Sequence, residues 1–165
     1  MEILKAATEW AKAEVFSTRF FILAGIAFIS IALGFWQLGK TELARAYIIP
    51  FSVAGALLLT IGVGLFYTNK ARIVSFAEQH KQDASAFLAS EMTRTESTLK
   101  EYSIVLKVVP MLVIAAALVL IFVNTPAWRA IAIATIAMLV VILLIDGMAH
   151  ARIEAYHKQL TAVEK

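Results

Sequence analysis

Four apolar stretches, 20–38, 47–67, 104–123 and 128–148, fill about half of this 165-residue chain and form two close pairs. Each is near the roughly 20 residues that an α-helix needs to cross about 30 Å of hydrocarbon. Lipid offers the backbone no hydrogen-bonding partners, so such stretches cross membranes as helices. The sequence therefore predicts an all-α integral membrane four-helix bundle built from two helical hairpins.

Composition supports a membrane protein. Charged residues make up 16% of the chain and hydrophobic residues 61%, whereas soluble domains have about 25% charged residues. Too little chain lies outside the apolar stretches for a separate soluble domain. The absence of cysteine excludes disulfides, thiolate metal sites and cysteine nucleophiles. The net charge of +3 is small, so we expect no nucleic-acid partner.

Lysine and arginine are distributed unevenly between the two sides of the predicted bundle. With four spans, twelve of the fifteen fall on the side of the termini and the central segment. The other three are Lys40, Arg45 and Arg129 in the short loops. Positive residues concentrate in cytoplasmic segments. We therefore expect a multi-pass protein of the bacterial inner membrane with both termini cytoplasmic.

Residues 1–18 are predicted to form an amphipathic helix before the first hairpin, 19–67. Its charged face carries Glu2, Lys5, Glu9 and Lys12. Two placements are open: a helix lying in the inner membrane interface and anchored by Trp10, or a helix packed on the cytoplasmic end of the bundle. Acidic residues precede the first apolar stretch and no clear cleavage site follows it, so we expect a retained span rather than a signal peptide.

The central segment, 68–103, contains no proline or glycine and is predicted to be helical. The second span should continue to about Gln82, with Asp83 as the N-cap of the next helix. These helices would form an antiparallel cytoplasmic stalk, followed by the second hairpin, 104–149, and a helical tail, 150–165. We expect the stalk to be either a partner surface or a simple connector. The candidate partner-surface residues are Phe87, Met92 and Leu99.

A short pattern occurs twice, with its first triplet repeated after 80 residues and its second after 77. Residues 71–73 and 151–153 both read Ala-Arg-Ile, and residues 80–82 and 157–159 both read His-Lys-Gln. One interpretation is a parallel 2+2 repeat, with two hairpins related by an axis along the membrane normal, as in some transporters. The other is chance similarity between apolar segments.

Lys107 and Asp146 lie inside apolar stretches near their predicted cytoplasmic ends. Charges within spans are costly, so they usually face inward and pair. Folding the second hairpin about its loop would bring these residues to similar depth. We predict an intramembrane ion pair, either a structural lock or a functional site for ions or protons. Pro110 removes a backbone donor one turn into the same span and is predicted to kink it.

Small residues recur every four positions in the first hairpin. They are Ser52, Ala56, Thr60 and Gly64 in the second stretch, and Ser30 and Gly34 in the first. Such rows let helix backbones approach closely. We expect them to pack the first hairpin; the alternative is a homodimer seam.

The chain has no recognisable catalytic motif or phosphate-binding loop. Its histidines, His80, His150 and His157, lack metal-ligand spacing, so we expect no metal and no cofactor. We predict a non-enzymatic protein that acts on a membrane protein partner, as an accessory subunit or an immunity-type protein against a membrane-active toxin. The alternative is a small oligomeric transporter or channel that uses Lys107 and Asp146. The expected partners are the lipid bilayer and either another membrane protein or further copies of the chain.

Overall fold

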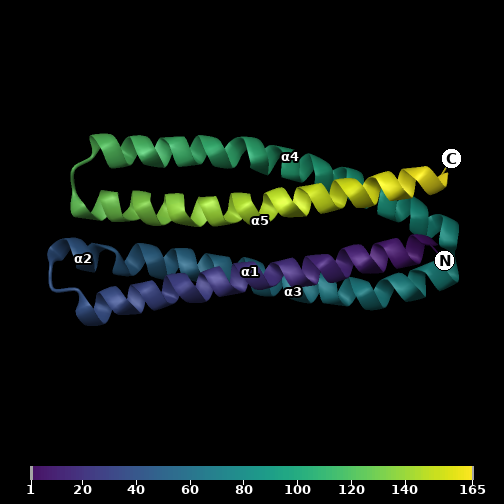
Figure 1. Ribbon diagram of the computed structural model, residues 1–165, viewed down its shortest axis with the longest axis horizontal. Helices are drawn as coiled ribbons and strands as arrows, with labels where there is room; N and C mark the ends of the chain where they lie inside the picture. Colours follow the sequence, from purple (N-terminus) through teal and green to yellow (C-terminus); the bar gives the residue numbers. More distant parts are fainter. Residues whose placement is uncertain (1, 165) are drawn as a thin grey trace.

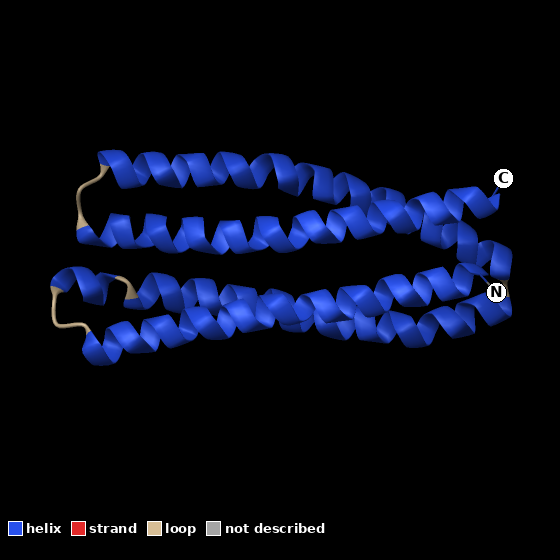
Figure 2. Ribbon diagram, viewed as in Figure 1, coloured by secondary structure: helices blue, strands red, loops and turns tan. Residues whose placement is uncertain are grey.

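The computed structural model describes residues 2–164, with the side chains of 2–163, and every regular element in that range is a helix (Figure 2). The elements are α1 (Glu2–Leu38), α2 (Glu42–Ala46), α3 (Ile48–Gln82), α4 (Ala84–Phe122) and α5 (Pro126–Glu164). The all-α prediction is confirmed. Four helical segments are long and apolar enough to cross a membrane: α1, α2 together with α3, α4 and α5.

The long helices run side by side along one axis (Figure 1). α1 packs against α3, and α4 packs against α5, so the chain forms two antiparallel hairpins. The two short connections, one containing α2, lie at one end of the molecule. The α3–α4 turn and both ends of the described chain lie at the other end. We call this second end the basal end.

The α3–α4 turn has the predicted local structure. α3 ends at Gln82, and the side chain of Asp83 accepts hydrogen bonds from the backbone N–H groups of Ser85 and Ala86. Asp83 is therefore the N-cap of α4, where it satisfies donors that have no partner within the helix. These hydrogen bonds also hold the pKa of the Asp83 carboxyl below its usual value.

α1 and α3 approach closely at Gly25, Gly55 and Gly62, which lie outside the predicted rows of small residues. A Cβ added to Gly25 would lie 2.7 Å from Leu59 Cγ and 3.0 Å from the backbone oxygen of Gly55. A Cβ added to Gly62 would lie 2.8 Å from Ile22 Cγ1. These positions leave no room for a side chain, so the packing seam of the first hairpin depends on glycine.

The predicted small-residue row does not form this seam. Ala56, Thr60 and Gly64 are exposed and Ser52 is half-buried, while Ser30 of α1 is also exposed. An added Cβ at Gly34 or Gly64 would have no atom within 4 Å. The seam of α3 runs through Ala54, Leu58 and Gly62, two positions out of step with the row. Two residues correspond to about 200° around a helix, which places the row on the opposite face.

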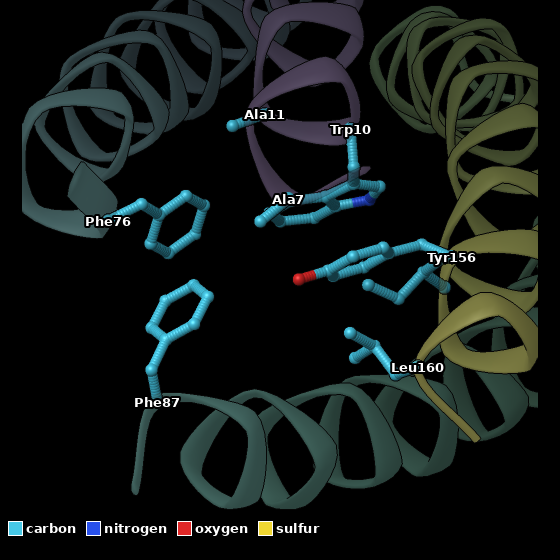
Figure 3. Close-up of a cluster of buried hydrophobic side chains, with 8 residues drawn as sticks. Ala7, Trp10, Ala11, Phe76, Phe87, Tyr156 and Leu160 are labelled. Carbon is cyan, nitrogen blue, oxygen red and sulfur yellow. The ribbon is translucent and has the colours of Figure 1, made fainter. Parts of the chain in front are cut away.

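The N-terminal segment packs on the bundle instead of forming a separate interfacial helix. α1 continues without a break from Glu2 to Leu38. Ala7, Trp10 and Ala11 are buried against side chains of the other three long helices (Figure 3). The buried residues of this basal core are Ala7, Trp10, Ala11, Phe76, Phe87, Ile153, Tyr156 and Leu160. Of the two placements open from the sequence, the structure has the packed one, because this apolar face is covered by protein.

The same core overturns the predicted partner surface. Phe87 is only 2% exposed, and Met92 and Leu99 pack against the basal core. The apolar face of α4 near Phe87 is thus turned inward, onto the basal core that it shares with α1, α3 and α5. The sequence showed that this face must be covered, but it did not show that the N-terminal and C-terminal segments cover it.

Candidate functional site

A polar cavity of about 310 Å³ lies among the four long helices, adjacent to the basal core. Its polar lining comes from Glu14 of α1, Asn69 and Arg72 of α3, Arg94, Thr98, Glu101 and Tyr102 of α4, and Asp146 of α5. Its remaining wall includes apolar side chains from the predicted spans, among them Phe21, Leu65 and Ile142. The cavity therefore lies where the apolar stretches meet the hydrophilic ends of the helices.

Arg94 is held by a carboxylate on its own helix. Its Nε and Nη2 atoms donate hydrogen bonds of 2.8 and 2.6 Å to the two carboxylate oxygens of Glu91. The guanidinium also lies 4.3 Å from the centre of the Trp10 ring. The two-pronged geometry fixes the guanidinium plane, and the aromatic face adds a cation–π contact.

Glu91 also joins α4 to α5. Tyr156 donates a hydrogen bond of 2.8 Å from its hydroxyl to Oε2 of Glu91, and both residues are buried. Burial and the nearby Glu91 carboxylate raise the pKa of the Tyr156 hydroxyl, so it remains a proton donor. The Tyr156 ring stacks on Trp10 with centroids 5.5 Å apart.

Glu14 and Arg152 connect the first and last long helices. Arg152 donates a hydrogen bond of 2.9 Å from Nε to Oε1 of Glu14, whose side chain is only 10% exposed. The Nη2 atom of Arg152 and the Nε1 atom of Trp10 are buried and have no hydrogen-bond partner among the described residues. Two N–H groups beside this ion pair are therefore available to a further acceptor.

Arg72 differs from Arg94 and Arg152 because no carboxylate neutralises it. Its Nη1 donates a hydrogen bond of 2.8 Å to the side-chain oxygen of Asn69. Within residues 2–163, no carboxylate oxygen lies within 4.0 Å of its guanidinium nitrogens. Burial, followed by the nearby charge of Arg94, lowers the pKa of Arg72. The cavity wall thus carries one guanidinium without a salt bridge in the described chain, although the nearby carboxylates of Glu91 and Glu14 oppose the lowering of its pKa.

The predicted ion pair between Lys107 and Asp146 is not formed. Asp146 lines the cavity, whereas Lys107 is exposed, and no salt bridge joins them in the described chain. α4 faces the cavity with Thr98, Tyr102 and Val105. Lys107 follows Val105 by two positions, so it points about 200° away around the helix. Although Lys107 and Asp146 lie at similar depth in the hairpin, their side chains point in different directions. Among the described residues, no cation lies within 4.0 Å of Asp146.

Pro110 lies outside the cavity lining, and α4 continues through it as one helix. The histidines stay apart: His157 Nδ1 lies 2.8 Å from the hydroxyl oxygen of Thr95, and His80 packs edge-on against Phe87. In the described part of the chain, no group of three or more His, Cys, Asp or Glu side chains is arranged to hold a metal ion.

The residues of the polar network were only partly visible in the sequence. The repeated Ala-Arg-Ile pattern contains Arg72 and Arg152, both of which reach toward α1. Glu14 was missed, although it follows Ala7, Trp10 and Ala11 on the same helical face. The helical spacing of Glu14 places its carboxylate on the apolar face of the predicted helix. A carboxylate in that position indicates a buried acid.

Within the described residues, the cavity wall has one guanidinium without a carboxylate within 4.0 Å, Arg72, and two carboxylates without a cation within 4.0 Å, Asp146 and the exposed Glu101. Such a wall can bind a group of either charge, or one molecule that carries both. Neither family models, nor curated proteins, nor solved structures gave a match to this chain.

Proposed function

We propose that the protein is a non-enzymatic membrane protein that binds another membrane protein, as an accessory subunit or an immunity-type protein against a membrane-active toxin. In this proposal the two hairpins cross the bacterial inner membrane. The basal end forms a cytoplasmic helical stalk, with both termini inside. The excess of Lys and Arg on that side supports this orientation.

The observation that carries the proposal is the uncovered surface of α4. The most apolar part of α4 is more apolar than that of any other long helix, yet only 6% of its residues are buried. In the most apolar parts of the other long helices, 22 to 28% of the residues are buried. Met111, Ile114 and Ile121 are all more than 60% exposed. This helix has the largest apolar face free to pack against a partner helix.

The proposal is tested by photocrosslinking in cells of the source organism. A photoreactive amino acid is placed at Met111 or Ile114 on the free face of α4. The matched control is Leu23 of α1, which is 61% exposed and also lies in a predicted span. We expect a single stoichiometric protein adduct from the α4 positions and none from position 23.

Equal adducts from all three positions, or lipid adducts alone, would contradict binding through α4. An adduct with a second copy of the chain would identify a homo-oligomer as the partner.

The second candidate is a small oligomeric transporter or channel. Asp146 favours it, because this carboxylate lies on a cavity wall without a cation. The parallel 2+2 repeat is part of this candidate, since the Ala-Arg-Ile triplet recurs at residues 71–73 and 151–153. A transport role predicts that Asp146→Asn abolishes flux in proteoliposomes whereas Lys107→Gln does not. Equal flux through wild-type and Asp146→Asn protein would argue against it.

A further inference from the structure

The polar cavity has a charge arrangement that the proposed partner surface on α4 does not use. We propose that this cavity binds the headgroup of a lipid that carries both a phosphate and a primary ammonium group, the phosphatidylethanolamine class. The cavity of about 310 Å³ is near the lower limit of small-molecule sites, which suits a headgroup.

The phosphate is assigned to the Arg72 side of the cavity. A guanidinium has five N–H donors, and Arg72 uses one of them on Asn69. No carboxylate within 4.0 Å competes for the others in the described chain. Arg94 lines the same cavity and adds positive charge, although Glu91 binds its Nε and Nη2. Arginine is suited to phosphate because its planar donors match two phosphate oxygens.

Other polar side chains share the cavity wall with Arg72. Tyr102 contributes a hydroxyl, whereas the hydroxyl of Thr98 already donates a hydrogen bond to the backbone oxygen of Arg94. Trp10 also lines the cavity, but its unpaired Nε1 lies on the side of the ring that faces α5 (Figure 3). The Tyr102 hydroxyl is therefore the donor that can join Arg72 at a bound phosphate.

The ammonium is assigned to Asp146, because Glu101, the other lining carboxylate without a salt bridge in the described chain, is exposed. The Asp146 carboxylate lies in the apolar stretch of α5 and has no cation within 4.0 Å among the described residues. Leaving a charge unpaired within a span is costly, so a bound cation would stabilise it. A primary ammonium can donate hydrogen bonds to this carboxylate, whereas the quaternary ammonium of phosphatidylcholine cannot.

The position of the cavity favours a lipid over a soluble zwitterion. Its wall combines Phe21, Leu65 and Ile142 from the apolar stretches with Arg72 and Arg94 from the hydrophilic helix ends. A cavity that spans this boundary lies at the depth of the lipid headgroups and offers apolar surface to the adjoining glycerol and acyl chains.

The test uses the purified full-length chain in mild detergent and native mass spectrometry. Phosphatidylethanolamine, phosphatidylcholine and phosphatidylglycerol with identical acyl chains are titrated separately. We expect phosphatidylethanolamine to bind about tenfold more tightly than the other two, because both of them carry the phosphate but lack the primary ammonium. Arg72→Gln and Asp146→Asn should each weaken its binding by about tenfold. The matched control is Lys107→Gln, which removes an exposed charge from α4 and should leave binding unchanged.

Free phosphoethanolamine and a free amino acid are added as competitors to separate the possible sources of the zwitterion. Preference for the complete lipid supports the headgroup site. Displacement of the lipid by millimolar amino acid would overturn it in favour of a soluble ligand. Equal binding of the three lipids would also overturn the proposal. So would a loss of phosphatidylethanolamine affinity in Lys107→Gln as large as that in Arg72→Gln and Asp146→Asn.

Each variant is first checked by circular dichroism and thermal unfolding. If Arg72→Gln or Asp146→Asn fails to fold, wild-type protein is labelled with a phosphatidylethanolamine that carries a photoreactive group near the headgroup. Crosslinks to peptides containing Leu65 or Val105 support the site. Crosslinks spread over the lipid-facing surface of α4 would refute it.

Discussion

Arg152 of α5 donates a hydrogen bond from Nε to Oε1 of Glu14 on α1, across 2.9 Å and 138 residues of sequence. Both side chains are mostly buried. This contact ties the last long helix to the first, and so joins the two hairpins at the basal end. Nearby, Tyr156 and Glu91 join α5 to α4. The basal end is thus held together by polar contacts as well as by the core around Trp10.

Glu14→Ala should lower the free energy of unfolding by about 3 kcal/mol, because Arg152 would remain as an unpaired, largely buried cation. Unfolding in mixed detergent micelles measures this change. The control is Glu154→Ala, which removes the exposed pair with Lys158 and should change stability little. The double variant Glu14→Ala, Arg152→Met should recover most of the lost stability, because it removes the unpaired cation. If the double variant is as unstable as Glu14→Ala, the unpaired charge of Arg152 does not cause the destabilisation.

Gly25→Ala should destabilise the first hairpin by about 1–3 kcal/mol, because the new Cβ would meet the side chain and backbone of Leu59. Gly64→Ala is the matched control, since an added Cβ there has open space around it. Thermal unfolding in detergent compares the two variants. Equal midpoints would mean that α1 and α3 are not packed as closely as the structure has them.

Tyr156→Phe should cost about 1.5 kcal/mol at neutral pH, because it removes a buried hydrogen bond to an ionised carboxylate. Because the pKa of Tyr156 is raised in the folded protein, the stability that this residue contributes depends on pH. The contribution to the free energy of unfolding is complete below the unfolded-state pKa of about 10. As pH rises further, the unfolded state loses the tyrosine proton while the folded state keeps it, so this contribution declines.

The stability difference between wild type and Tyr156→Phe should therefore narrow between pH 9 and pH 11. Unfolding at several pH values measures it. A difference that grows over this range would contradict the assigned hydrogen bond.

Asp83→Ala should lower the thermal midpoint and increase amide hydrogen exchange in the first turn of α4. The reason is that the N–H groups of Ser85 and Ala86 lose their acceptor. Because the folded-state pKa of Asp83 is depressed, its contribution is present above the unfolded-state pKa near 4. It is lost as pH falls through the folded-state value. Unchanged exchange at residues 84–87 would show that the cap is not formed.

The sequence by itself determined the helices. The lengths of the apolar stretches predicted four long helices in two hairpins, and the structure has four helices of that kind. Asp83 marked the turn between α3 and α4, because capping depends on residues that are neighbours in the chain. These features are local, so one sequence was enough to predict them.

Only the tertiary structure decided which helix faces meet. The apolar spans are apolar around their whole circumference, so hydrophobic periodicity did not distinguish the Gly62 face of α3 from the Gly64 face. Depth along a hairpin likewise did not fix the rotation that separates Lys107 from Asp146. Burial at the basal end was easier to predict, because Trp10 and Phe87 lie on amphipathic segments whose apolar faces need to be covered. Which segment covers each face depends on contacts between distant parts of the chain, and these follow from packing all four helices together.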